Sequence, residues 1–379
     1  MSRVDAQTLS RAHEAAATIA PMAPEIERAR RLPPAALDAL VGAGVFKLMV
    51  PRALGGAEAS VSTVLAVIEA IARADGSAGW CAMIGSTSGL MAAFLPDDVA
   101  REVYEPENAI TGGVFAPMGV ARRVEGGYQV GGRWPFASGS QHCSHVMGGA
   151  MIAGAERPEM RSVLFRADEI RILDTWDTGG LRGTGSHDFE AEDVLVPEGR
   201  AFSLLGAPRR SETLYRQPFF GTLAAGVASV SLGIARGALD ALIALATTKA
   251  AGPGSKKTIA HRELVQLHVA RAEGIVGAAR AQLVESVEAI ADEVAREGSA
   301  SIRSRAQVRL AACHAASESA RAVDLAYEAG GGSAIYASSP LQRCFRDAHT
   351  ATAHVMVSAT SATMVGRVLL GLDVDTTTL

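Results

Sequence analysis

Roughly one hundred residues with the pattern of β-strands lie between two long regions with the pattern of helices. From about residue 106 to 205, glycine pairs and alternating apolar residues occur in ARRVEGGYQVGGRW, HVMGGAMI and RSVLFRADEIRIL. In the flanking regions apolar residues recur every three or four positions, as in STVLAVIEAIARAD. This order predicts an α+β protein with a helical domain at 1–105, a small β-barrel at 106–205 and a helical bundle at 206–379.

Glycine and proline mark the ends of several expected elements. Pro33 and Pro34 can open a helix at its first turn, and Gly42 and Gly44 can close it. The run EGGY, which starts at Glu125, predicts a hairpin turn, because glycine adopts the positive φ angles that tight turns need. The run EDVLVPEG is the expected last strand of the sheet domain.

Length and charge exclude some classes of protein. The chain has 379 residues, of which 48% are apolar, so it can bury two or three cores. Lys plus Arg (36) and Asp plus Glu (40) nearly balance at a formal charge of −4, and neither sign forms a long run. The sequence therefore argues against binding of nucleic acid and against binding to an anionic membrane surface.

The cysteines and the apolar runs bear on the compartment. The four cysteines, Cys81, Cys143, Cys313 and Cys344, never form a CxxC pair, so we expect neither disulfides nor a zinc knuckle. The N-terminal residues lack the unbroken apolar stretch of a signal peptide. The most apolar window, at 221–245, contains charged and many small residues, which favours a packed helix over a membrane span. We therefore expect a cytoplasmic protein without a transmembrane segment.

Several common catalytic motifs are missing from the sequence. It contains no GxGxxG or GxxxxGK loop, no HExxH and no GxSxG elbow. The cluster HCSH at 142–145 has metal-binding residue types, but alternate residues of a strand face opposite sides of a sheet. We therefore expect no bound metal and no NAD-binding domain in this chain.

Two segments rich in glycine and small hydroxyl residues stand out in the sheet region. The first is GRWPFASGSQHCSH at 132–145, and the second is WDTGGLRGTGSHDF at 176–189, in which Arg182, Thr184 and Ser186 surround glycines. Such segments can bring backbone amides and hydroxyl groups against a flat ligand, so the pair indicates a cofactor site. For the first segment alone, an ordinary hairpin with a buried Trp134 is the alternative.

Two histidines lie five residues apart in RDAHTATAHVMVS, at 346–358. If this stretch is one helix, with about 100° per residue, His349 and His354 lie about 140° apart and cannot share a narrow pocket. The helix face through His354 continues with apolar and small residues: Ala351, Val357, Ser361, Val365 and Val368. We therefore expect His354 to face inward as a neutral base and His349 to face solvent. A core histidine bonded to a backbone carbonyl is the alternative for His354.

The order of the three regions and two long motifs resemble the acyl-CoA dehydrogenase superfamily over essentially the whole chain. AGGGSAIYASSPLQRCFRDAHTATAH is similar to that superfamily's glycine loop and the helix after it, and EDVLVPEG is similar to its exit from the sheet domain. The two positions of the catalytic glutamate in acyl-CoA dehydrogenases fall at Val355 and near Leu223. The resemblance therefore implies the dehydrogenase fold without the dehydrogenase base.

Four further segments resemble one branch of this superfamily, the flavin-dependent monooxygenases that hydroxylate phenols, indoles and related rings. These segments are GVFAPMG, GRWPFASG, WDTGGLRGTGS and an RDxxTxxxH ending, in this order. The resemblance implies that His354 is the substrate base and that Ser138 lies near the flavin N5. It implies flavin contacts from these residues: Trp134, Phe136, Ser138, Arg182, Thr184 and Ser186. Trp80 and Tyr336 are candidates to line the pocket for the aromatic substrate, and a place in the core or at a subunit interface is the alternative for each.

The resemblance also implies a reaction and partners. The protein would be the oxygenase component of a two-component monooxygenase, using O2 and reduced flavin (FADH2 or FMNH2) supplied by a separate NAD(P)H-dependent reductase. A flavin C4a-hydroperoxide would hydroxylate a small aromatic substrate, and the chain would assemble as a homotetramer. A flavin dehydrogenase or oxidase with a base other than glutamate, and a scaffold without flavin, remain alternatives.

Overall fold

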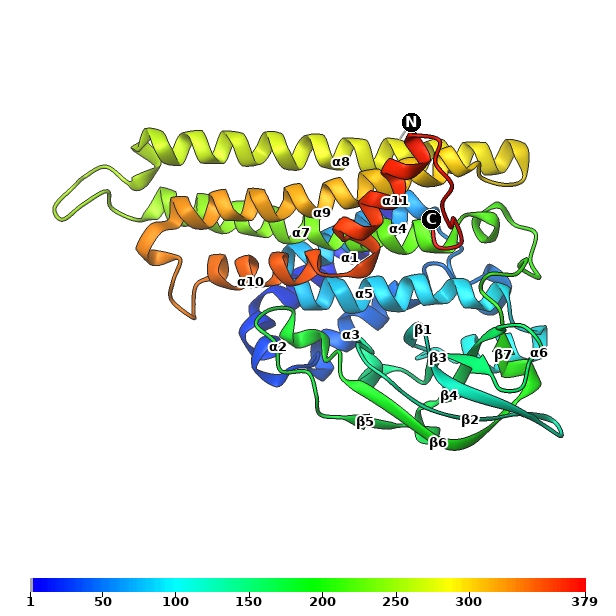
Figure 1. Ribbon diagram of the computed structural model, residues 1–379. Helices are drawn as coiled ribbons and strands as arrows, with labels where there is room; N and C mark the ends of the chain where they lie inside the picture. Colours follow the sequence, from blue (N-terminus) through cyan, green and yellow to red (C-terminus); the bar gives the residue numbers. More distant parts are fainter. Residues whose placement is uncertain (1–2) are drawn as a thin grey trace.

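The computed structural model describes residues 3–379 and places layers of helices on one side of a β-sheet (Figure 1). The N-terminal helices are α1 (Ala6–Ile19), α2 (Ala23–Ala29), α3 (Pro34–Gly42), α4 (Val61–Ala74), α5 (Gly76–Ser88) and α6 (Asp97–Tyr104). Asp5, Ser60 and Asp75 cap α1, α4 and α5, because each side chain accepts a hydrogen bond from a backbone N–H of the first turn. The expected helix after Pro33 is confirmed as α3.

Seven strands form one sheet in the order β5-β6-β2-β1-β3-β4-β7. They are β1 (Thr111–Val124), β2 (Gly127–Trp134), β3 (His145–Ile152), β4 (Met160–Arg166), β5 (Arg171–Leu173), β6 (Asp188–Pro197) and β7 (Ala201–Phe202). The predicted hairpin is confirmed, with Gly126 at φ 83° between β1 and β2. The sheet has β5 and β7 as its two edges, so it is open where the sequence predicted a small barrel.

Strand β1 pairs antiparallel with β2 and parallel with β3, and its ladder with β3 is interrupted between Val114 and Gly119. The interruption is the segment GVFAPMG, in which Met118 is exposed. The expected last strand, EDVLVPEG, lies at the end of β6 and is followed only by the two-residue β7. The irregular part of β1 therefore coincides with one of the segments that carried the family resemblance.

The C-terminal half contains α7 (Phe219–Thr248), α8 (Glu263–Glu297), α9 (Ile302–Gly330), α10 (Pro340–Thr352) and α11 (Ala359–Leu369). Helices α7, α8 and α9 run side by side (Figure 1). Helix α7 is long and apolar enough to cross a membrane, but 67% of its most apolar window is buried inside the protein. At Gly233 of α7 an added Cβ would lie 2.5 Å from the Glu69 carbonyl oxygen, so glycine permits the close packing of α7 on α4.

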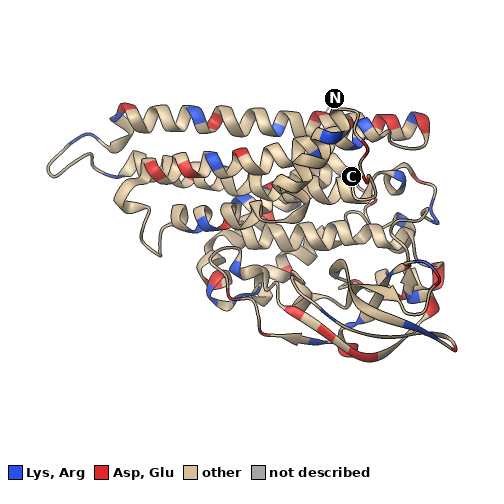
Figure 2. Cartoon of the chain, in the orientation of Figure 1, with Lys and Arg blue, Asp and Glu red and all other residues tan. Residues whose placement is uncertain are grey.

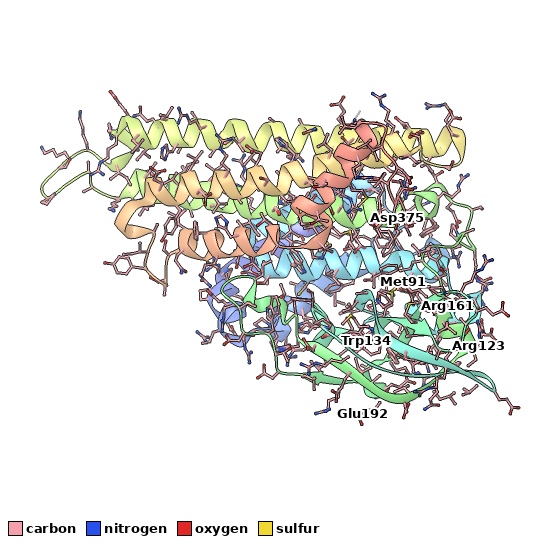
Figure 3. All side chains as sticks on the ribbon, in the orientation of Figure 1. Met91, Arg123, Trp134, Arg161, Glu192 and Asp375 are labelled. Carbon is pink, nitrogen blue, oxygen red and sulfur yellow. The ribbon has the colours of Figure 1, made fainter. Side chains whose placement is uncertain are left out.

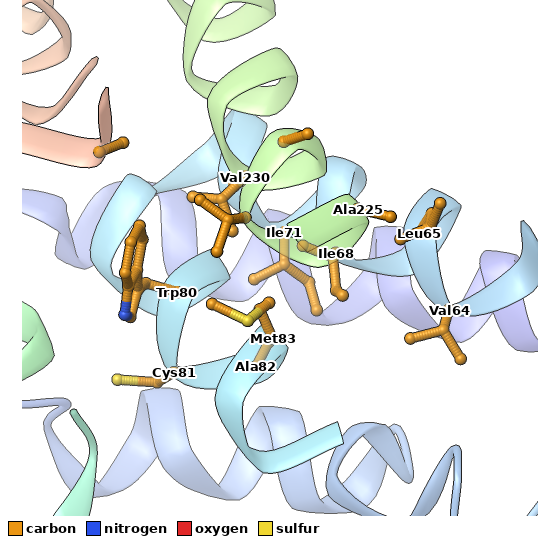
Figure 4. Close-up of a cluster of buried hydrophobic side chains, with 14 of the residues drawn as sticks. Val64, Leu65, Ile68, Ile71, Trp80, Cys81, Ala82, Met83, Ala225 and Val230 are labelled. Atoms are coloured by element: carbon orange, nitrogen blue, oxygen red, sulfur yellow. The ribbon is translucent and has the colours of Figure 1, made fainter. Parts of the chain in front are cut away.

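The main core joins the N-terminal helices to the bundle (Figure 4). Ile68 and Ile71 of α4 and Met83 of α5 pack with Val230 of α7, and Trp80 lies at one end of this cluster. Arginines and acidic residues are interspersed along the outer helix α8, with most of the acidic residues in its C-terminal half (Figure 2). Helix α5 is thus held between the bundle and the sheet.

The expectation of one continuous helix through His354 is wrong. Helix α10 ends at Thr352, the chain turns through Val355–Val357, and α11 begins at Ala359. His354 is extended, with φ −67° and ψ 131°, and its Nδ1 accepts a hydrogen bond from the Met356 N–H at 3.3 Å. Ser361 Oγ donates to the Val355 carbonyl at 2.7 Å, and such side-chain bonds to the backbone compete with helix continuation.

Candidate functional site

Ser138 lies where two loops are joined by backbone hydrogen bonds. The loop after β2 carries Ser138, and the loop between β5 and β6 carries Thr184 and Ser186. The Ala137 N–H donates to the His187 carbonyl at 3.0 Å, and the Gly139 N–H donates to the Thr184 carbonyl at 2.9 Å. These bonds fix the loops side by side and bring the two segments predicted to form a cofactor site together.

A row of buried hydroxyl groups begins at Ser138. Ser138 Oγ lies 2.6 Å from Ser186 Oγ, which lies 2.7 Å from Thr184 Oγ1. Thr184 Oγ1 donates to the Leu181 carbonyl at 2.8 Å. At the other end of the row, Trp80 Nε1–H donates to Ser138 Oγ at 3.1 Å. Each of the three hydroxyl groups is therefore bonded within the protein.

Trp80 on α5 connects Ser138 with His354. Its indole N–H bonds Ser138, and its ring meets the His354 ring edge-on at a centroid distance of 5.4 Å. Three residues predicted from distant parts of the sequence are thus brought to one place between α5, the sheet loops and the turn after α10. Trp80 lies beside His354, so its proposed place in the substrate pocket stays a prediction.

His354 is a neutral imidazole at neutral pH. Burial, and secondarily the positive charge of Arg309, lower the pKa of His354 to about 4. Its Nδ1 accepts from the Met356 N–H, so the neutral ring carries its proton on Nε2 in this geometry. His349 is exposed and pairs with Asp324 at 2.8 Å, as expected for a solvent-facing residue.

The turn that holds His354 is anchored by Arg309, which sequence reasoning missed. Arg309 of α9 is fully buried and donates to the Met356 carbonyl at 3.2 Å. It also contacts Ser361 Oγ at 3.5 Å and donates to the Thr378 carbonyl. No sequence motif marks this residue, since its role depends on α9 lying beneath the turn.

Phe136 presents an aromatic ring to the surface beside Ser138. Its side chain is 69% exposed and its φ is 65°, a left-handed conformation that aromatic residues seldom adopt. The ring of Trp176 meets Phe136 edge-on at 6.2 Å, and Trp176 Nε1 is held by the Leu181 carbonyl at 3.1 Å. Trp176 was recognised only as part of a motif and is a further aromatic group of this site.

The expectation that Trp134 packs against a flavin is wrong. Trp134 lies in the sheet domain (Figure 3) and is fully buried. Its ring stacks on Phe189 at a centroid distance of 4.8 Å and contacts Phe165 at 5.5 Å. Its Nε1 donates to the Gly149 carbonyl at 2.7 Å. The side chain has no free face or donor for a ligand, so the alternative of a buried hairpin tryptophan is correct.

Three other predicted residues lie in different positions from those expected. The hydroxyl groups of Thr184 and Ser186 are buried behind Ser138 and bonded, which contradicts direct contact of these groups with a flavin. Arg182 is partly exposed and pairs with Asp177 at 3.1 Å, so it is still available to a ligand. Tyr336 is 65% exposed and precedes α10, whose 13 residues separate it from the His354 end by about 20 Å. The structure therefore does not bring Tyr336 to the site.

The HCSH cluster has structural roles. His142 Nε2 accepts a hydrogen bond from the Leu32 N–H at 3.3 Å, while burial lowers the pKa of both His142 and His145. Within residues 3–379 no group of three or more His, Cys, Asp or Glu side chains could hold a metal ion.

A buried carboxylate fixes the 174–187 loop to α10. Asp347 Oδ1 accepts from the Leu181 N–H at 2.6 Å, and the side chain lies beside α5, where Asp75 is also buried. Burial and the neighbouring Asp75 raise the pKa of Asp347 to about 7. Arg343 lies 4.0 Å from Asp75, and Arg346 pairs with Glu27 at 2.5 Å. Asp347 thus sets the position of the loop that carries Thr184 and Ser186.

Replacement of Gly180 by alanine is expected to displace this loop. An added Cβ at Gly180 would lie 2.2 Å from the Arg346 carbonyl oxygen, whereas at Gly179 it would meet nothing within 4 Å. We expect Gly180→Ala to lower the free energy of unfolding by about 1–3 kcal/mol and to weaken flavin binding. Gly179→Ala is the matched control. Chemical denaturation and flavin titration of both variants test this prediction. Equal free energies of unfolding and equal dissociation constants for flavin in the two variants would refute it.

The residues present fit a flavin. A flat ring system needs an apolar surface, which the exposed Phe136 ring provides, and Ser138 Oγ next to it can meet a ring nitrogen. Glycine-rich backbone lies on both sides, as the sequence predicted. When bound, the flavin supplies the redox chemistry and the reaction with oxygen, and the protein supplies position and protons.

Comparisons with known proteins agree with this architecture. The family model for the acyl-CoA dehydrogenase N-terminal domain matches residues 8–97, and the model for the C-terminal domain matches residues 225–359. The chain is 35% identical over 350 residues to the indole-3-acetate monooxygenase of Pseudomonas putida, covering 92% of this chain and 89% of that protein. It is 31% identical over 369 residues to the oxygenase component of the FADH(2)-dependent resorcinol hydroxylase of Rhizobium sp. (strain MTP-10005), covering 92% and 90%.

Solved structures give the same result. The 3-HSA hydroxylase from Rhodococcus sp. RHA1 matches with a TM-score of 0.93 at 27% identity and covers 100% of both chains. XiaF from Streptomyces sp., solved in complex with FADH2 and glycerol, matches with a TM-score of 0.89 at 30% identity, covering 97% of this chain and 96% of its own. The chain therefore belongs to the two-component flavin-dependent monooxygenases with the acyl-CoA dehydrogenase fold, as an oxygenase component.

Proposed function

We propose that this protein uses reduced flavin and O2 to hydroxylate a small aromatic substrate of the phenol or indole type. The observation that carries the proposal is the position of Trp80, which links Ser138 on the flavin side to His354 on the substrate side. A flavin ring beside Phe136 and Ser138 would leave the substrate between the flavin and His354. The geometry thus accounts for both halves of the reaction at one junction of the fold.

An indole with an acidic side chain is the substrate class that we favour. Two indole-3-acetate monooxygenases, from Pseudomonas putida and Acinetobacter baumannii, are 35% and 32% identical to this chain. The relative from Rhizobium is named a resorcinol hydroxylase, so we also include phenols among the substrates to be tested.

We propose that His354 accepts the proton of the substrate O–H or N–H as the ring becomes nucleophilic. To accept at Nε2 the ring must carry its proton on Nδ1 and give up the bond from the Met356 N–H. Leaving the Met356 N–H without its acceptor costs about 1–3 kcal/mol, which is small beside the barrier of a chemical step, so this change of tautomer is accessible. A dehydrogenase or oxidase reaction has less support, because Val355 and Leu223 stand where acyl-CoA dehydrogenases have their glutamate.

The partners that we propose follow from this chemistry. A separate NAD(P)H-dependent reductase would supply reduced flavin, since the chain has no GxGxxG loop for a nicotinamide cofactor. We further propose a homotetramer in the cytoplasm, and FAD ahead of FMN because FADH2 is named for two of the relatives.

The proposal is tested by product formation. The protein is supplied with reduced FAD from a flavin reductase, NADH and air, together with indole-3-acetate, indole, resorcinol or phenol. We expect one of these to gain a hydroxyl group only when the protein is present. A second assay tests the dehydrogenase alternative, with butyryl-CoA and oxidised FAD in the absence of O2. Oxidation of butyryl-CoA there, together with no hydroxylated product from the aromatic substrates, would establish a dehydrogenase.

Phe136→Ala is expected to weaken flavin binding about tenfold, because the exposed ring would otherwise cover one face of the flavin. Leu195→Ala removes an exposed apolar side chain from β6 of the same sheet and is the matched control. Anaerobic titration with reduced FAD measures both. Equal dissociation constants for the two variants would remove Phe136 from the proposed site.

A further inference from the structure

We infer that the row Thr184–Ser186–Ser138 fixes the direction of the Ser138 hydroxyl so that the site selects reduced over oxidised flavin. The inference rests on the proposed function, with the flavin ring beside Ser138, and on the position of Ser138 near the flavin N5 that the family resemblance implies. Thr184 and Ser186 are then positioning residues that act through Ser138, and Trp80 is a third.

The direction follows from a count of protons. Three close O···O contacts, of 2.6, 2.7 and 2.8 Å, join Ser138, Ser186, Thr184 and the Leu181 carbonyl. Each contact needs one proton, and the carbonyl has none to give. Thr184 must therefore donate to the carbonyl, Ser186 to Thr184, and Ser138 to Ser186. Any other assignment leaves two oxygen atoms in contact without a proton between them.

This assignment also fixes which further hydrogen bonds Ser138 Oγ can make. Its Oγ accepts from Trp80 Nε1–H at 3.1 Å and gives its own proton to Ser186, so only one lone pair is left. Ser138, Ser186, Thr184 and Trp80 are all buried, and the cavity on the inner side of Ser138 has a volume of only about 10 Å³. Such a cavity holds at most one water molecule, so bulk solvent does not reach Ser138 from this side.

A ligand atom that meets Ser138 must therefore be a hydrogen-bond donor. N5 of reduced flavin carries a proton and can donate, whereas N5 of oxidised flavin has only a lone pair. Two lone pairs facing each other in a buried site would leave both unsatisfied, which is unfavourable by about 1–3 kcal/mol. The protein thus distinguishes the two redox states of flavin through the polarity of one hydroxyl group.

Two substitutions release this constraint. In Thr184→Val the Ser186 proton loses its acceptor and can turn to Ser138, which then donates to a ligand. In Ser186→Ala the Ser138 proton itself loses its acceptor. Thr184→Ser keeps a hydroxyl group at the same position and is the matched control for Thr184→Val.

The test is anaerobic titration of each protein with oxidised FAD and with dithionite-reduced FAD. We expect the wild type to bind reduced FAD at least tenfold more tightly. Thr184→Val and Ser186→Ala should narrow this ratio about tenfold, and Thr184→Ser should retain it. A tenfold smaller preference for reduced FAD corresponds to a two-electron reduction potential of the bound flavin that is lower by about 30 mV. Spectroelectrochemistry measures this potential independently of the titrations.

The outcomes separate the inference from the proposed function. If Thr184→Val and Ser186→Ala weaken binding of both flavin states equally, the row has only a structural role and the inference is wrong. A wild type that binds reduced FAD no better than oxidised FAD also overturns it, while the proposed function stands. A wild type that binds neither form overturns both.

Discussion

His354→Ala is expected to lower the rate of hydroxylation about 100- to 10,000-fold at saturating reduced flavin, the range typical for loss of a general base. Binding of reduced FAD should fall far less than the rate, because His354 reaches Ser138 only indirectly, through its edge-on contact with Trp80. Single-turnover mixing with O2, followed by product analysis, separates these two effects.

His354→Asn distinguishes a base from a simple hydrogen-bond donor. Asparagine can donate to the substrate oxygen but cannot take up a proton, so we expect it to be as slow as alanine. A hydroxylation rate of the Asn variant within tenfold of the wild-type rate would contradict the role of His354 as a general base. Because the pKa of His354 is lowered to about 4, the wild-type profile should also lack an acid limb near pH 6.5.

Asp347→Asn is expected to stabilise the protein at pH 8 but not at pH 4. The pKa of Asp347 in the folded protein is raised to about 7 by burial and Asp75, above its ordinary value near 4. Its contribution to stability is therefore fully present below pH 4 and is lost as the pH rises through 7. Asparagine keeps an oxygen that accepts from the Leu181 N–H but carries no charge. Removal of the buried charge should raise the free energy of unfolding by on the order of 2–4 kcal/mol at pH 8.

The measurement is chemical denaturation of both proteins from pH 4 to 8. The groups facing Asp347 are Asp75, Arg343, Arg346 and Cys344, so partial coupling to Asp75 is expected. Asp324→Asn, which removes the half-exposed partner of His349, is the matched control and should show no comparable trend. A stability difference for Asp347→Asn that is independent of pH would mean that Asp347 is ionised throughout this range.

The sequence predicted the fold, through a resemblance carried by long motifs. Ser138, Trp80 and His354 come from three separate regions of the sequence, and the fold brings them together. The local sequence pattern alone could not predict that these three residues meet, because their contacts depend on the position of α5 between the bundle and the sheet. The error at Trp134 has a local cause. Strand β2 ends at Trp134, and the left-handed φ of Phe136 turns the second aromatic ring outward while the first stays in the core.

Three other features of the site arise from contacts that sequence periodicity does not record. The helix expected through His354 is interrupted because the His354 ring and Ser361 bond the backbone of the turn. The raised pKa of Asp347 comes from its burial and, second, from Asp75 before α5, far earlier in the chain. Arg309 was missed for the same reason, because its partners are carbonyl groups of the C-terminal segments.

The most direct test of the central claim is the source of the oxygen atom in the product. The protein is mixed with reduced FAD and indole-3-acetate in the absence of air and then exposed to isotopically labelled 18O2. The account predicts that one labelled atom enters the aromatic product, as detected by mass spectrometry, and that His354→Ala loses this product. A hydroxylated product that carries oxygen from water, or oxidation of the flavin by O2 without any labelled product from either indole-3-acetate or resorcinol, would contradict it.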